Sequence, residues 1–312
     1  MPRPPIPAEV RRAVLVEAGH KCAIPRCEHP NVDAHHIVPW EICERHEYKN
    51  LIALCPNCHR RAHKGQIDRK SLLLYKASLV AAFRALGTTA FTAPIVEAKR
   101  RIYEVEPSHP DCVFDFEFPD FCDANACIAS KNIEAWGNEL LYLFRHSQEA
   151  EHRQHPAKAE PPIAWLVGKY DVVRRDPWVL SVRYKIEQMC FGAVHRSIET
   201  RVQNFLLDPF QPITLEELLA AEEALSQLAE VARAALFRSG SALDRDWVIS
   251  GTAPRIENFS CFTVDRYGFE FIFGEYQVAC YAAGEQRIGL PFDELSGIFK
   301  SEALEALTQH DS

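Results

Sequence analysis

The sequence predicts an α+β protein in which a small N-terminal ββα domain, stabilised by zinc, precedes a larger α+β domain. Three observations support this division. Four cysteines form two short pairs within the first 58 residues, strand-like segments dominate the second half, and charge is distributed unevenly between the two parts. We assign residues 1–87 to the first domain, residues 88–99 to a linker and residues 100–312 to the second domain.

Composition indicates a globular protein in a reducing compartment. The 312 residues are 47% hydrophobic and 25% charged, which is enough for two separate cores. No segment reaches the roughly 20 apolar residues of a membrane span, and the N-terminus lacks the apolar region of a signal peptide. We therefore expect a cytoplasmic protein without membrane contact. The odd number of cysteines, 11 in all, favours metal binding over a disulfide framework.

Charge differs between the two parts of the chain. Residues 1–86 hold 14 Lys and Arg against 8 Asp and Glu, a balance of +6, and the remaining residues hold 21 against 35, a balance of −14. A basic module that meets a polyanion, joined to an acidic module that does not, explains this asymmetry. Chance unevenness of surface charge is the alternative.

The first domain is expected to run as helix, strand, loop, strand and two helices. Helical spacing of apolar residues and Gly or Pro at the ends define the helices, and β-rich composition defines the strands. The expected elements are a helix over 7–19, strands over 31–40 and 50–55, a short helix over 56–65 and an amphipathic helix over 68–87.

The second domain is expected to consist of strands interrupted by a single long helix. Thr214 and Glu217 form a T-x-x-E capping box at the start of that helix, and Gly240 follows its end. Strand-like segments are separated by polar or Pro-containing breaks. They cover residues 163–173, 178–186, 200–207, 257–265, 269–273 and 276–281.

The paired cysteines predict a structural zinc site. Cys22 and Cys27 bracket four residues, and Cys55 and Cys58 bracket two. Four thiolates complete a tetrahedral shell and leave no position open for water, which is typical of structural zinc. Cys43 lies between the pairs without a partner at a suitable spacing, and we interpret it as an ordinary cysteine.

Histidines lie between these cysteine pairs and directly after the second pair. His59 and His63 are four residues apart on an expected helix and therefore share one face, where both imidazoles can reach a single cation. A solvated basic face is the alternative for such a pair. His35 and His36 are adjacent on an expected strand, so their side chains point to opposite faces and serve different purposes.

These residues resemble the HNH, or ββα-metal, endonucleases. The resemblance covers residues 8–66 and rests on D-A-H-H-I-V-P at 33–39, Asn50-Leu51, and L-C-x-x-C-H-x-x-x-H at 54–63. It implies that His36 is the general base that activates water, and that Asn50 ties the loop between the strands and so orients His36. Asp33 is a second-shell candidate whose role stays open.

The resemblance also implies a catalytic cation. His35, His59 and His63 would be its ligands, and His59 also counts among the catalytic residues. The cation would be Mg²⁺ or another divalent ion such as Mn²⁺ or Ni²⁺, acting in one-metal hydrolysis of phosphodiester bonds. Arg60, Arg61 and Lys64 lie on the same helix and are candidates for sequence-independent contacts with DNA phosphates, with a solvated basic face as the alternative.

The second domain resembles the domain shared by RsiV-type anti-sigma factors and PdaC-type peptidoglycan deacetylases, over roughly residues 100–300. The matching segments are 192–195, 215–218 and 276–284. The resemblance implies an antiparallel sheet with one long packed helix, and a domain that senses a ligand or a protein. His195, Tyr276 and Tyr281 are interpreted as core and turn residues, because tyrosines among small residues usually pack.

Together these patterns predict a metal-dependent DNA endonuclease that its second domain regulates. Regulation would involve an activating ligand or protein, or assembly into a homo-oligomer, in antiphage defence or another setting of conditional toxicity. Two alternatives stay open. One is a restriction-type endonuclease whose second domain recognises its DNA target, and the other is a non-catalytic zinc-dependent DNA-binding module.

Overall fold

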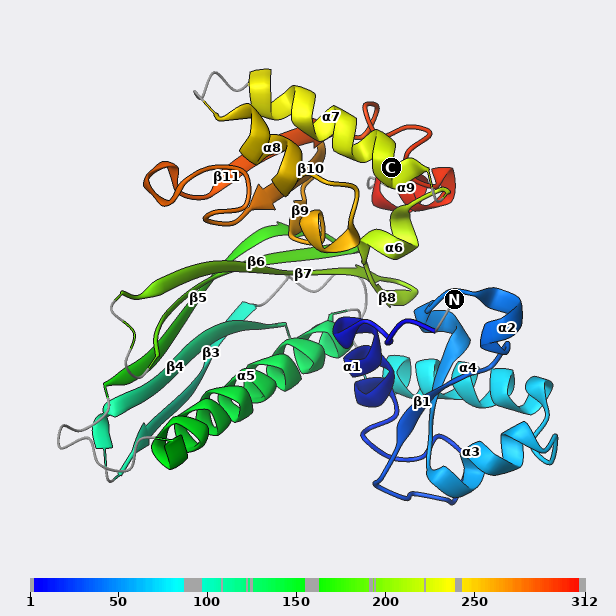
Figure 1. Ribbon diagram of the computed structural model, residues 1–312. Helices are drawn as coiled ribbons and strands as arrows, with labels where there is room; N and C mark the ends of the chain where they lie inside the picture. The colour runs from blue at the N-terminus through cyan, green and yellow to red at the C-terminus, as the bar shows by residue number, and fades with distance from the viewer. Residues whose placement is uncertain are drawn as a thin grey trace. The chain divides into compact units, whose positions relative to one another are not determined.

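The computed structural model contains two compact units, and each is considered separately (Figure 1). The first unit comprises Met1–Ala98, Asp120–Trp136 and Leu207–Pro212, and the second comprises Lys99–Pro119, Gly137–Leu206 and Ile213–Ser312. Domain boundaries at residues 87 and 100 stay a prediction. The structure describes residues 3–86, 97–107, 109–121, 123, 126–154, 163–190, 193, 195–221, 223–238 and 243–308.

The first unit has the expected order of elements. Two short helices that were not predicted, α2 and η1, lie in the loop between its paired strands. The elements are α1 (Ala8–Glu17), β1 (Asp33–His36), α2 (Trp40–Cys43), η1 (Tyr48–Asn50), β2 (Leu51–Leu54), α3 (Pro56–His63), α4 (Arg69–Leu86) and β8 (Phe210–Pro212).

Strands β1 and β2 form an antiparallel pair that carries the predicted motif. Its register places His35 opposite Ile52 and His36 opposite Leu51. All four residues of β2 are buried, so this strand anchors β1 in the core. Helix α3 follows directly, with Pro56 in its first turn and the Cys55 sulfur accepting a hydrogen bond from the Cys58 amide. The chain turns away from the helix at Gly65, whose φ of +69° favours glycine.

A buried ion pair joins α1 to α4. The Glu17 carboxylate accepts hydrogen bonds from the Tyr48 hydroxyl at 2.7 Å and from the Lys76 ammonium at 2.5 Å. Glu17 and Lys76 side chains are only 1% and 8% exposed, and the ammonium lies 3.8 Å from the centre of the Tyr48 ring. Because a buried charge is costly without a partner, this triad fixes the two helices relative to each other.

The second unit contains a curled sheet in the order β3-β4-β5-β6-β7 (Figure 1). Pairs β5/β6 and β6/β7 are antiparallel as expected, but β4 and β5 run parallel, which makes the sheet mixed. The elements are β3 (Glu97–Glu106), β4 (His109–Phe121), α5 (Cys127–Gln154), β5 (Ala164–Arg175), β6 (Val179–Met189) and β7 (Ser197–Leu207), with β3, β4, α5 and β7 divided between the units.

Three of these elements, β3, β4 and α5, were not predicted. Strand β3 begins at Glu97, inside the segment expected to be a linker, and the remainder of that linker at 88–96 lies outside the described residues. Helix α5 is the longest described, with 28 residues. It approaches the sheet closely at Gly137, where an added Cβ would lie 2.8 Å from Ile102 and 3.0 Å from Phe116.

The rest of the second unit is a three-stranded antiparallel sheet, β11-β10-β9, covered by α7 (Figure 1). Its core is rich in phenylalanine, with Phe262, Phe269 and Phe271 in mutual contact. Among the described helices none has the length and hydropathy of a membrane crossing. The elements are α6 (Leu215–Leu218), α7 (Ala224–Arg238), α8 (Arg245–Gly251), η2 (Ile256–Asn258), β9 (Phe262–Val264), β10 (Gly268–Phe273), η3 (Tyr281–Ala283), β11 (Gln286–Pro291) and α9 (Ser301–Thr308).

Two expectations for this region are wrong. The helix expected to run from Thr214 to Gly240 is interrupted after Leu218, because Leu219 is extended and forms a β-bridge with Phe299. The capping box is nevertheless present, with the Thr214 hydroxyl accepting from the Glu217 amide at 3.4 Å. The expected strand at 276–281 is a turn followed by η3, and the strand that pairs with β10 is β11.

Candidate metal centre and active site

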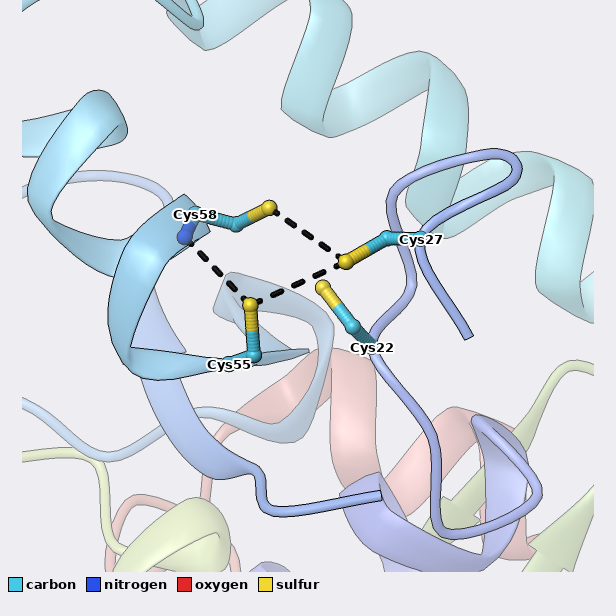
Figure 2. Close-up of side chains that lie close together, drawn as sticks. All are labelled: Cys22, Cys27, Cys55 and Cys58. Atoms are coloured by element: carbon cyan, nitrogen blue, oxygen red, sulfur yellow. Dashed lines mark hydrogen bonds between the residues drawn. The ribbon is translucent and has the colours of Figure 1, made fainter. Parts of the chain in front are cut away.

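Four cysteine sulfurs converge, two from the segment between α1 and β1 and two from the start of α3 (Figure 2). Cys27 Sγ lies 3.7 Å from Cys55 Sγ and 3.8 Å from Cys58 Sγ. Zinc–sulfur bonds of about 2.3 Å in tetrahedral geometry place neighbouring sulfurs about 3.8 Å apart. These sulfur–sulfur distances therefore fit one zinc ion.

Thiolates are the form that binds a metal. Burial raises the pKa of the Cys22 thiol and of the Cys58 thiol, whereas at Cys55 burial is outweighed by hydrogen bonds, first with Cys58, which lower its pKa to about 7. Zinc is the ion that structural four-cysteine sites hold. Cys22, Cys27, Cys55 and Cys58 thus indicate a closed structural zinc site, as predicted.

Three histidine side chains converge on a second point of the same unit. His35 comes from β1, while His59 and His63 come from one face of α3, and their ligand nitrogens all lie within 4.8 Å of one another. The His35 ring contacts the other two edge-to-face, at centroid distances of 4.6 and 5.1 Å. Exposure increases from buried His35 to exposed His63, so this cluster opens toward solvent.

Electrostatics keep the innermost histidine neutral. Burial, followed by the neighbouring His59 and His63, lowers the pKa of His35 to about 4. A neutral imidazole offers a nitrogen lone pair, which is the form that binds a cation. The donor set therefore fits a divalent transition ion or a similar cation with further positions open to water or phosphate.

His36 is buried beside this cluster but contacts a different set of side chains. Its Nδ1 lies 2.9 Å from the Arg3 guanidinium and its Nε2 lies 3.2 Å from His46 Nδ1. Trp40 contacts the His36 ring edge-to-face at 5.8 Å. Burial, followed by the Arg3 charge and His46, lowers the pKa of His36 to about 4, which leaves the imidazole neutral and able to accept a proton.

Asn50 ties together the loop that follows β1. Its side-chain oxygen accepts a hydrogen bond from the Val38 amide at 2.8 Å, and its Nδ2 donates to the Val38 carbonyl at 3.2 Å and to Cys43 Sγ at 3.4 Å. This is the geometry expected of a residue that closes the loop between the strands. Cys43 thus lies apart from the cysteine cluster, as predicted.

Comparison with known families identifies this arrangement. Residues 20–65 match the family model described as HNH endonuclease. They form an HNH endonuclease domain. Such a domain is a phosphodiester hydrolase that acts on nucleic acid and typically uses a divalent cation. The matched segment contains both clusters, the four cysteines and the three histidines.

The second unit has relatives of its own. Residues 216–293 match the family model described as a protein of unknown function, DUF3298, and the predicted resemblance of this region is confirmed at the level of the domain. Solved structures of DUF3298 proteins from Bacteroides fragilis and Pseudomonas aeruginosa are similar. The Bacteroides fragilis protein has 14% identity and a TM-score of 0.48, and the alignment covers 69% of this chain and 98% of that chain. The Pseudomonas aeruginosa protein has 17% identity and a TM-score of 0.49, and the alignment covers 71% of this chain and 100% of that chain. No curated protein matches the chain.

The other predicted residues of the HNH domain lie on its surface. Asp33 pairs with Arg11 at 3.2 Å and its side chain is 74% exposed. Its charge opposes the lowering of the His59 pKa by burial, and a second-shell role stays a prediction. Arg60, Arg61 and Lys64 are exposed along α3. The Arg60 guanidinium donates to Asn57 at 2.5 Å.

Sequence reasoning missed Arg3, Trp40 and His46 in the HNH domain. Trp40 stacks on the His46 ring at 4.5 Å, and the Arg3 guanidinium lies 5.7 Å from the centre of the Trp40 ring. These three residues surround His36. No motif marks them, because the contacts join the N-terminal segment to a loop more than 30 residues away.

In the DUF3298 region the core interpretation of the tyrosines is wrong. Tyr276 and Tyr281 are 63% and 51% exposed and stack on each other at 5.7 Å. Tyr276 lies in a turn with a φ of +65°, and Tyr281 begins η3, so their interpretation as turn residues is confirmed. His195 is exposed as well.

Proposed function

We propose that the chain is a metal-dependent DNA endonuclease in which His36 is the general base. The observation that supports this most directly is the position of a neutral, buried His36 next to three converging imidazoles on one short ββα frame. Adjacent residues on β1 thus have two tasks. His35 contacts the other histidines of the cation site, and His36 contacts Arg3, Trp40 and His46.

Each residue has a defined part in this proposal. His35, His59 and His63 would hold a divalent cation, which would supply positive charge at the phosphate that is cleaved. His36 takes a proton from the attacking water at an unprotonated ring nitrogen. Asn50 holds the loop that surrounds His36.

DNA as the substrate is supported by charge. The balance of +6 over residues 1–86 suits a phosphate backbone. The balance of −14 over the remaining residues disfavours direct contact between that part and DNA. We therefore propose that the second unit regulates the nuclease by sensing an activating ligand or protein, or by assembly, in a defence against phage.

Substitution of His36 tests the assigned base. His36→Ala is expected to lower the rate of plasmid nicking with Mg²⁺, Mn²⁺ or Ni²⁺ by about 10²- to 10⁴-fold, the usual contribution of a general base. Zinc content and thermal unfolding should stay those of the wild type. The matched control is His195→Ala, an exposed histidine of the second unit. Equal nicking by His36→Ala and wild type would remove His36 from the mechanism, whereas a wild-type protein that does not nick would fit the non-catalytic alternative or a missing activator.

Regulation is tested with the wild-type protein. Nicking is compared with and without cyclic oligonucleotides and lysates of phage-infected cells, with His36→Ala as the inactive reference. Stimulation of the wild type alone supports sensing. Constitutive cutting restricted to one DNA sequence or modification would favour the restriction-type alternative.

A further inference from the structure

A continuous series of hydrogen bonds runs from Arg3 through His36 and His46 to the Pro4 carbonyl. The contacts are Arg3 Nη2 to His36 Nδ1 at 2.9 Å, His36 Nε2 to His46 Nδ1 at 3.2 Å, and His46 Nε2 to Pro4 O at 2.9 Å. Both ends of this series have fixed roles. A guanidinium only donates hydrogen bonds, and a carbonyl oxygen only accepts them.

These fixed ends constrain the protons between them, and the Arg45 backbone carbonyl is a second hydrogen-bond acceptor for the His36 ring. Because Arg3 donates, His36 Nδ1 must be unprotonated, so His36 is neutral and carries its proton on Nε2. Because the Pro4 oxygen accepts, His46 Nε2 carries a proton. A protonated His46 Nδ1 would face the His36 Nε2–H, so His46 Nδ1 must be the acceptor. Both rings are therefore neutral Nε2–H tautomers.

Packing and the loop hydrogen bonds hold His46 in this orientation. Its ring is stacked on Trp40, with centroids 4.5 Å apart and planes inclined by 28°. Trp40 begins α2, and Asn50 hydrogen-bonds to the loop on both sides of that helix, at Val38 and Cys43. These contacts fix the orientation of the His46 ring independently of His36, so His46 Nδ1 is a fixed acceptor.

We propose that His46 is a positioning residue that fixes His36 in the Nε2–H tautomer and leaves Nδ1 as the nitrogen that accepts the proton of water. This inference rests on the proposed function of His36 as general base. In the step concerned, one proton leaves water and joins His36 Nδ1, and the resulting imidazolium keeps donating through Nε2–H to His46. Arg3 must give up its hydrogen bond to Nδ1 before water can take that place.

The tautomer is measured directly by long-range proton–nitrogen correlation spectra of the ¹⁵N-labelled, zinc-loaded full chain at neutral pH. The His36 signals are assigned by their loss in His36→Ala. We expect a single Nε2–H form in the wild type and in Arg3→Ala, which keeps His46. In the Arg3→Ala background, where no guanidinium holds Nδ1, His46→Ala should mix the two tautomers, and His46→Asn should restore the single form, because its amide oxygen accepts near the position of Nδ1. An unchanged single form in the Arg3→Ala, His46→Ala double variant would assign the tautomer to the Arg45 backbone and overturn the proposal.

Nicking rates complete the test. His46→Ala is expected to lose about ten- to a hundred-fold, the usual effect of a residue that orients a functional imidazole, and His46→Asn should recover most of that loss. A mixed tautomer with full nicking would also overturn the positioning role. If His36→Ala itself nicks normally, the base assignment fails while the spectra still establish the hydrogen bond, so the two failures are distinguishable. Zinc content shows that each variant keeps its fold.

Discussion

The cysteine cluster and the histidine cluster belong to the same short HNH domain, yet they differ in closure. Four cysteine sulfurs surround one point, and three of the four side chains are buried. Three histidines leave their point incompletely surrounded, and their exposure increases toward His63. Both clusters draw ligands from α3 and from an earlier segment. Ligand number and exposure therefore distinguish a closed centre, suited to structural zinc, from an open centre that a substrate could reach.

The difference in exposure between the two clusters follows from where their ligands lie along α3. Cys55 and Cys58 lie at the N-terminal end of the helix, where the chain arrives from a buried strand. His59 directly follows Cys58, and His63 lies about one turn further, at the exposed end of the helix. A centre placed at the buried end stabilises the fold, and a centre placed further along stays accessible to a substrate.

The largest effect is expected at the closed centre. Cys58→Ser removes one thiolate from the cysteine cluster, and structural zinc contributes on the order of 10–16 kcal/mol in zinc-finger peptides. We expect loss of bound zinc and unfolding of the first unit, measured by metal analysis and by thermal unfolding. Cys190→Ser is the control, because Cys190 is an exposed cysteine of the second unit. Zinc retention and unchanged unfolding in Cys58→Ser would contradict a closed four-thiolate centre.

A smaller and purely functional effect is expected at the open centre. His63→Ala removes an exposed ligand, so zinc content and the unfolding temperature should stay unchanged. Nicking should fall by at least about ten- to a hundred-fold, because even partners that only orient a metal ligand contribute that much, and a higher Mn²⁺ concentration should restore part of the rate. His195→Ala serves as the reference. Simultaneous loss of zinc from His63→Ala would show that the two centres are not independent.

The cysteine cluster could be predicted from the spacing of its two pairs and the pair of His59 and His63 from helix geometry, whereas the part of His35 followed from the resemblance to the HNH endonucleases. A C-x-x-C-H-x-x-x-H segment on one helix places two thiols and two imidazoles by helix geometry alone. The surroundings of His36 could not be predicted in this way. His46 is held by the Pro4 carbonyl, 42 residues earlier in the chain, and such long-range contacts leave no periodic signal.

The same reasoning explains the errors in the second unit. The helix predicted between Thr214 and Gly240 is present as α7, but pairing of Leu219 with Phe299 ends the preceding short helix early. Tertiary hydrogen bonds thus override helix propensity at one residue. Apolar letters at 276–281 indicated a strand, whereas the Gln277 side chain hydrogen-bonds to the carbonyls of Gly251 and Asn258 and fixes a turn.

The smallest effect is expected on the exposed face of α3. If Arg61 contacts a DNA phosphate, Arg61→Gln in the His36→Ala background should reduce the salt dependence of duplex binding, with the slope of log K against log salt changing by about 0.9. Arg245→Gln, an exposed arginine of α8, is the control. The slope is measured by fluorescence anisotropy over a range of salt concentrations without cleavage. An unchanged slope would show that Arg61 belongs to a solvated face of the helix. Contact with DNA would then be expected near the open histidine centre and not along the exposed face of α3.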